Sequence, residues 1–125
     1  MSNPTSPTDA VGALSALAHE QRLAVFRLLV KAGPEGLSAG AIAEALQSAP
    51  SSLSFHLAHL HRAGLVSQRR ESRSLIYTAS YDSLVGLIGF LLEDCCGGRP
   101  ELCEPLTDLI RQATCCPAPV QSARA

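Results

Sequence analysis

Apolar residues recur every three or four positions through the first half of the chain, which is the period of a helix buried along one face. The first predicted helix starts at Asp9, which can cap it. The second starts near Glu20 and stops at Gly33-Pro34, a typical helix end. The predicted buried positions are Val11, Leu14, Leu17 and Ala18 in the first helix, and Leu23, Phe26, Leu29 and Val30 in the second.

Two shorter helices with a brief break between them are predicted next. Ser38 is placed to cap the first of these helices. Pro50 fits the first turn of the second, which ends at Gly64. Their apolar positions are Ala39, Ile42, Ala43 and Leu46 in the first, and Leu53, Leu57 and Leu60 in the second.

The period then changes to that of strands, which are predicted at 65–70 and 75–79 around a turn at 71–74. A fifth helix runs from Ser80 or Tyr81 to about Asp94, and its apolar residues cover most of its circumference. Such a helix must be buried on both sides, and a second protomer is the simplest cover. A last helix fits 104–113, with Pro105 in its first turn.

Two short helices, a tight turn and a two-stranded ribbon describe a winged helix-turn-helix. We therefore expect a mainly α fold with a two-stranded β-wing, in a homodimer. The length of 125 residues suits a single core. The expected division is a flexible leader at 1–8, one DNA-binding and dimerisation domain at 9–114, and a flexible tail at 115–125.

Charge is distributed unevenly although the net charge is only −1. Residues 51–80 contain four arginines and one glutamate, whereas residues 81–108 contain six acidic residues and one arginine. A basic middle and an acidic far end indicate that one face meets a polyanion.

The helix that starts at Pro50 fits the major groove of DNA. When its leucines face inward, Ser51, Phe55 and Arg62 turn outward. Arginines in the turn between the strands suit contact with the DNA backbone or minor groove. Two alternatives without DNA stay open: ordinary helix capping explains the serines, and a solvated face explains the arginines. Phe55 either touches a thymine methyl group or packs on a partner, and His56 is expected to be half-buried and bonded to backbone.

The stretch from Leu14 to Thr78 resembles the ArsR family of winged-helix metal-responsive repressors. It includes the runs LSALAHEQRLAVFRLLV, LSAGAIAEAL, SSLSFHLAHLHRAGLV and RRESRSLIYTAS. The resemblance implies homodimers formed through the first and last helices, and DNA contact by three serines and a histidine of the recognition helix. The candidate DNA contacts, including those read from the residues alone, are Ser51, Ser52, Ser54, His56, His59, Arg62, Arg69, Arg70 and Arg73.

Five cysteines are many for so short a chain. They occur as Cys95-Cys96, Cys103 and Cys115-Cys116. The chain opens without a signal peptide, and no apolar stretch reaches the roughly 18 residues of a membrane span. We therefore expect a cytoplasmic protein that does not bind membranes. In that compartment, clustered thiols more often bind metals or react than form structural bridges.

The resemblance also concerns the inducer. The position of the familiar thiol motif of arsenic sensors is occupied here by residues 36–40, which contain no cysteine. The set Cys95, Cys96 and Cys103 is similar to a relocated three-cysteine site of some arsenic-responsive members. Trivalent arsenic and antimony are soft and take three thiolates in a pyramid, whereas zinc takes four ligands. The expected inducer is therefore arsenite or antimonite, with no organic cofactor, and its binding releases the repressor from operator DNA.

Other uses of the cysteines stay open. The same fold could sense redox state through these thiols, or bind zinc or cadmium with a fourth thiolate from Cys115 or Cys116. That pair could also be a separate weak thiol pair or idle. A vicinal disulfide, or a methylated arsenical held by Cys95-Cys96 alone, are further variants. A thiol enzyme such as an arsenate reductase is disfavoured because a Cys-x-x-Cys motif in a βαβ context is missing. An interaction module without effector is the remaining alternative.

Overall fold

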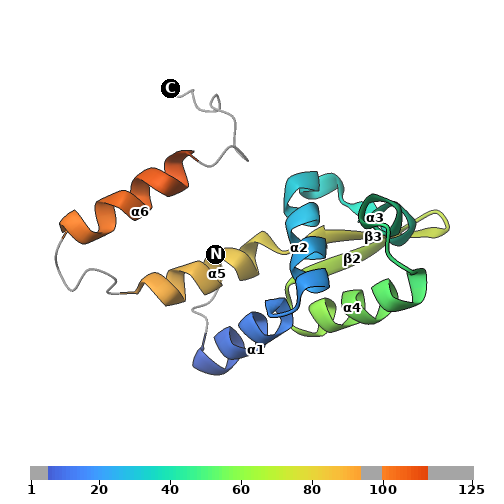
Figure 1. Cartoon of the computed structure of the whole chain (residues 1–125), viewed down its shortest axis with the longest axis horizontal. Helices are drawn as coiled ribbons and strands as arrows, with labels where there is room; N and C mark the ends of the chain where they lie inside the picture. Colours follow the sequence, from blue (N-terminus) through green and yellow to red (C-terminus); the bar gives the residue numbers. More distant parts are fainter. Residues whose placement is uncertain (1–5, 94–99, 113–125) are drawn as a thin grey trace. The chain divides into compact units, whose positions relative to one another are not determined.

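The computed structural model describes residues 6–93 and 100–112. The chain divides into two compact units, one ending at Phe90 and the other starting at Leu91, and each is described by itself. Figure 1 shows the order of the elements. They are α1 (Pro7–Leu17), α2 (Glu20–Ala32), the 3₁₀ turn η1 (Gly33–Glu35), β1 (Leu37–Ser38), α3 (Ala39–Leu46), α4 (Pro50–Arg62), β2 (Val66–Glu71), β3 (Ser74–Ala79), α5 (Tyr81–Leu92) and α6 (Pro100–Gln112).

The N-cap of helix α1 lies three residues earlier than predicted, and the helix turns a different face inward. Ser6, rather than Asp9, is its N-cap, and the Asp9 amide donates to Ser6 Oγ at 3.1 Å. The buried face consists of alanines, Ala10, Ala13 and Ala16. Val11 is 66% exposed, Leu14 is 43% exposed and Ala18 is exposed too, so the predicted stripe was wrong for all but Leu17. Alanine lets a helix approach its neighbour closely, and the larger side chains are left outside.

Helix α2 is joined to its neighbours at its first turn. His19 caps it, since His19 Nδ1 accepts from the Gln21 amide at 3.1 Å. Arg22 Nε donates to the carbonyl of Ala16 at the end of α1, at 2.6 Å. Gln21 donates to Ser48 Oγ in the turn between α3 and α4. Phe26 and Leu29 are buried as predicted, together with Val25, whereas Leu23 is exposed.

Helices α3 and α4 form the predicted pair. Ser38 caps α3 by accepting from the Ala41 amide at 3.1 Å, and Ile42 is buried. Pro50 occupies the first turn of α4. Leu53, Leu57 and Leu60 are each at most 1% exposed, which confirms the inward stripe predicted for this helix.

The sheet is antiparallel, with the strand order β1-β3-β2. Strands β2 and β3 form the predicted wing, whose register runs from Val66 opposite Ala79 to Glu71 opposite Ser74. Strand β1 was not predicted; its two residues are too few to show alternation. In Figure 1 the sheet lies beside α2, α3 and α4. These observations confirm a mainly helical winged helix-turn-helix with a small antiparallel sheet.

Helix α5 is anchored at its start and exposes apolar residues further along. The Tyr81 hydroxyl donates to the carbonyl of Val30 at 2.9 Å, and Ser83 Oγ donates to the carbonyl of Gly64 at 2.6 Å. Leu87 is buried, but Val85 and Ile88 are exposed. Within the unit that ends at Phe90, the described residues thus cover only one side of this apolar helix, as predicted.

Helix α6 begins at Pro100, four residues earlier than predicted, so Pro105 lies inside the helix. Pro100 supplies the first-turn proline expected of Pro105. Among residues 6–93 and 100–112, no helix is long and apolar enough to cross a membrane.

Gly36 joins η1 to the sheet at a position that only glycine fits. Its φ is +71°, and a Cβ there would overlap the Tyr77 carbonyl oxygen and the side chains of Ile76 and Thr78. We predict that Gly36→Ala lowers the free energy of unfolding by about 1–3 kcal/mol, measured by urea denaturation. Gly40→Ala is the control, because a Cβ there meets only Ser38 Oγ at 3.9 Å. Equal stability of the two variants would contradict this explanation.

Candidate nucleic-acid interface

The outward face of α4 follows from its inward leucines. The exposed residues on the side away from those leucines are Ser51, Ser52, Ser54, Phe55, Ala58 and Arg62, and we call this set the outward face of α4. Most of its side chains are small, and Arg62 supplies a cation near the helix C-terminus. The first turn of α4 has no side-chain cap among the described residues. Its amide groups are therefore free to donate to an anion such as a phosphate.

His56 lies at the border between this face and the core. It is half-buried, as expected, but the expected bond to backbone is not found. Its Nδ1 is buried and has no hydrogen-bond partner in the described part of the chain. The ring instead lies against that of His19, with centroids 4.6 Å apart. The cap of α2 and the recognition helix therefore meet through two imidazole rings.

Two histidines of α4 are held toward the neutral form. Burial lowers the pKa of His56 below 6.5, with further lowering by His19, Arg22 and His59. The pKa of His59 is also lowered, by desolvation first and then by Arg22, Arg62 and His19. The positive charge of these neighbours makes protonation of His56 and of His59 less favourable.

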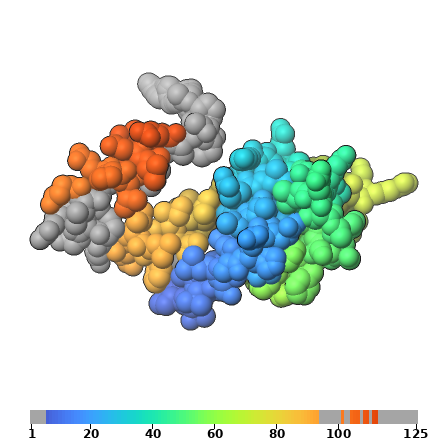
Figure 2. Space-filling model, viewed as in Figure 1, coloured from blue at the N-terminus to red at the C-terminus, as the bar shows by residue number. Residues whose placement is uncertain are grey.

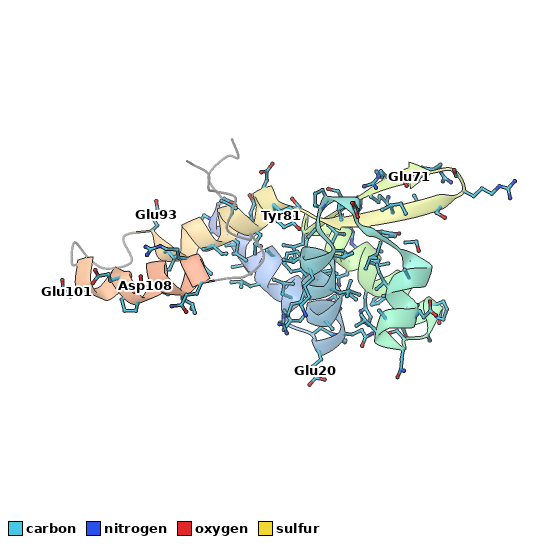
Figure 3. The ribbon with its side chains drawn as sticks, turned by 90° about the horizontal axis from the view of Figure 1, so that it is seen from above. Glu20, Glu71, Tyr81, Glu93, Glu101 and Asp108 are labelled. Atoms are coloured by element: carbon cyan, nitrogen blue, oxygen red, sulfur yellow. The ribbon has the colours of Figure 1, made fainter. Side chains whose placement is uncertain are left out.

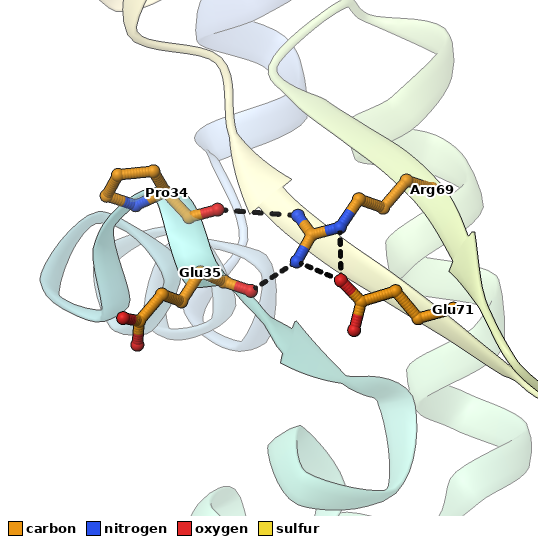
Figure 4. A network of polar contacts seen from close by, with 4 residues as sticks. All are labelled: Pro34, Glu35, Arg69 and Glu71. Atoms are coloured by element: carbon orange, nitrogen blue, oxygen red, sulfur yellow. Dashed lines mark hydrogen bonds and ion pairs between the residues drawn. The ribbon is translucent and has the colours of Figure 1, made fainter.

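The wing is braced by an arginine that we had predicted as a DNA contact. Arg69 donates to the carbonyl of Pro34 at 3.3 Å and to that of Glu35 at 2.9 Å (Figure 4). It also pairs with Glu71 at 2.9 Å. The guanidinium thus connects β2 to the turn that precedes β1. This placement assigns Arg69 a positioning role alongside its predicted one.

Arg70 and Arg73 are exposed in the wing. The wing is drawn in yellow in Figure 2, where its tip projects beyond the helices. Figure 3 shows Glu71 on this hairpin, well apart from Glu20 at the start of α2. An exposed arginine on a projecting hairpin can reach a surface that α4 also touches.

The structure adds two polar residues that the sequence did not single out. A shallow hollow of about 210 Å³ lies between α4 and the wing. His61 and Gln68 line it together with Ser54 and Arg62. No pattern in the sequence brings a helix end and a strand together, so this proximity could be found only from the fold.

The predicted thiol site lies outside what the structure describes. Cys95, Cys96, Cys115 and Cys116 fall in undescribed segments, and for Cys103 only the backbone, in the first turn of α6, is described. Within the described residues, no cluster of three or more histidine, cysteine or acidic side chains could hold a metal ion. The three-cysteine site stays a prediction.

Comparison with known proteins decides the family. The "Helix-turn-helix domain" family matches residues 17–69. The nodulation protein NolR of Rhizobium meliloti is 38% identical over 82 residues, which are 66% of this chain and 65% of that protein. The transcriptional activator HlyU of Vibrio cholerae is 38% identical over 82 residues, 66% of this chain and 73% of that protein.

Comparison with solved structures agrees with the comparison of sequences. Reduced HlyU from Vibrio cholerae gives a TM-score of 0.55 at 34% identity, covering 69% of this chain and 90% of that one. The homodimeric winged helix-turn-helix DNA-binding domain of a possible ArsR-family regulator from Mycobacterium bovis gives 0.57 at 25% identity, covering 74% and 85%. The chain belongs to the ArsR family of winged helix-turn-helix transcriptional regulators. Relatives that are named as transcription regulators, such as the transcriptional activator HlyU, confirm the prediction against a thiol enzyme.

The lowered pKa of His56 makes stability depend on pH. In the unfolded chain this histidine takes up its proton near pH 6.5, before the folded chain does, so acid favours unfolding. The stabilisation is complete above pH 6.5 and is lost as the pH falls toward the lower folded value. We predict a lower melting temperature at pH 5.5 than at pH 7.5, and a smaller difference in His56→Gln.

The measurement is thermal unfolding followed by circular dichroism at the two pH values. The exposed His61, changed to Gln, is the matched control and should keep the difference seen in the wild type. Identical pH dependence in wild type and His56→Gln would remove His56 as its source.

Proposed function

We propose that the protein is a homodimeric, cytoplasmic repressor that places α4 in the major groove of operator DNA and the wing against the flanking backbone. The observation that carries this proposal is the outward face of α4. It presents small side chains, one arginine and one aromatic ring to solvent on the second helix of a helix-turn-helix, where base readers lie.

Each contact has a role that its chemistry suits. Hydroxyl groups near the uncapped start of α4, together with its free amides, suit phosphate oxygens and base edges. Arg62, Arg70 and Arg73 suit phosphates, whereas Arg69 chiefly holds the wing in place. The proposed DNA contacts on α4 are Ser51, Ser52, Ser54, His56, His59 and Arg62.

Exposed apolar residues on two helices support the proposed homodimer. Val11 and Leu14 on α1, and Val85, Ile88 and Leu91 on α5, are exposed. Exposed apolar side chains on neighbouring turns of a helix are typical of an interface. The Mycobacterium bovis relative is described as homodimeric, and the same assembly here would place two copies of α4 on one duplex.

Loss of the proposed phosphate contact can be measured directly. We predict that Arg62→Ala weakens binding to all duplexes about equally and reduces the slope of log affinity against log salt by about one. Arg27→Ala, which removes an exposed arginine from α2, is the control and should keep the wild-type slope. An unchanged slope in Arg62→Ala would mean that no phosphate is contacted there.

For the inducer, we propose that arsenite or antimonite binds Cys95, Cys96 and Cys103 and releases the DNA. Three thiolates suit these soft ions. The backbone of Cys103 lies in the first turn of α6, and Cys95-Cys96 follow shortly after α5, a helix with apolar residues that suit the dimer interface. A ligand that joins the two segments would restrain the end of α5. A coupling of roughly 1–3 kcal/mol is typical of such switches.

Substitution of single cysteines distinguishes the proposed three-cysteine site from the second pair. We predict that Cys95→Ser, Cys96→Ser and Cys103→Ser each keep wild-type DNA affinity but no longer release DNA on addition of arsenite, as measured by gel shift. Cys115→Ser and Cys116→Ser are the matched controls and should respond normally. A normal response in Cys103→Ser would exclude the three-thiolate site, and loss of response only in the controls would move the site to the second pair.

A redox switch at the same thiols is the second candidate. The observation that favours it is the solved relative described as reduced HlyU, a description that names a redox state. Peroxide would then release DNA and dithiothreitol would restore binding, while arsenite would have no effect on its own. Zinc and cadmium, tested beside them, would act only if a fourth thiolate were recruited from Cys115 or Cys116.

A further inference from the structure

Phe55 is an exposed aromatic ring in the middle of the outward face of α4. Its residue is 63% exposed. Ser51 lies four positions before it and Arg62 seven positions after it, so all three point in nearly the same direction at about 100° per residue. The buried Leu53 and Leu57 lie on the opposite side of the helix. Phe55 therefore projects directly away from the core.

The neighbours of this ring on the helix surface are small. Ser51, Ser52, Ser54 and Ala58 carry short side chains, so Phe55 reaches further from the helix axis than they do. Because its neighbours are small, the Phe55 ring would reach deepest if this face of α4 entered the major groove. The exposed apolar residues that suit the dimer lie on α1 and α5, so Phe55 is separate from that set.

The ring also contacts that of its neighbour in sequence, His56. The centroids of Phe55 and His56 are 5.9 Å apart, with an angle of 66° between the ring planes. This edge-to-face arrangement is a favourable one for aromatic pairs. His56 in turn lies against His19.

We infer that Phe55 is a specificity-determining residue that recognises thymine by its C5-methyl group in the major groove. The inference rests on the proposed binding of DNA by α4. Among the four bases, thymine alone presents a methyl group in that groove, and apolar side chains are its usual partners. A phenyl ring cannot accept or donate a hydrogen bond as an arginine or glutamine would. Its contribution is therefore selective for the methyl group.

The test removes only that methyl group. Short duplexes carrying the binding site found by gel shift upstream of the gene are made with single thymine-to-deoxyuridine replacements. For the wild type, we expect about fourfold weaker binding at one or two positions in each half-site, the factor that corresponds to one methyl-sized group. For Phe55→Ala, uracil and thymine should bind equally at those positions, and for Phe55→Leu the difference should be intermediate.

Two further readouts make the outcome decisive. Circular dichroism should show that Phe55→Ala folds as the wild type does, because the ring is exposed. Arg27→Ala, at an exposed position of α2 outside this face, is the control and should keep full discrimination. If no deoxyuridine replacement weakens wild-type binding, or if the loss is the same in Phe55→Ala, the role of Phe55 is wrong while DNA binding stands. If the wild type binds no duplex, the proposed function falls and this inference with it.

Discussion

The inward leucine stripe of α4 is the constraint on which the rest of the interface depends. Leu53, Leu57 and Leu60 are almost completely buried, and their burial fixes the rotation of the helix about its axis. A rotation of one residue, about 100°, would turn Ser52 or Ser54 toward the core and move a leucine toward solvent. The hydrophobic effect does not depend on DNA, yet by burying the leucines it determines which side chains of α4 face outward, toward the proposed DNA.

Helix α1 also has one face that packs against the core and another that is exposed. Its alanines lie against the core and its larger residues, Val11 and Leu14, are exposed. A single chain would gain more from burying the larger residues inside, so their exposure suits a second surface that covers them. The junction of α1, α2 and α4 is polar, with Arg22 bonded to Ala16 and the His19 ring against His56.

Much of the fold could be predicted from the sequence, because strong local signals agreed with the tertiary structure. Ser38, Pro50 and the α4 leucines each gave a correct helix start or face. The face of α1 could not be predicted, since valine, leucine and alanine are all apolar and only the packing decides which are inside. The role of Arg69 depends on carbonyl groups of residues 34 and 35, more than thirty positions away along the chain. Two-residue β1 carries no periodicity at all.

We propose that two copies of this chain read DNA together through α4. Selection of bound sequences from a random duplex pool by the purified protein tests this most directly. The expected result is an inverted repeat whose half-sites are about 10 base pairs apart, one helical turn or a multiple of it. A pool with no enriched sequence, or one enriched in a single half-site without its inverted partner, would contradict it.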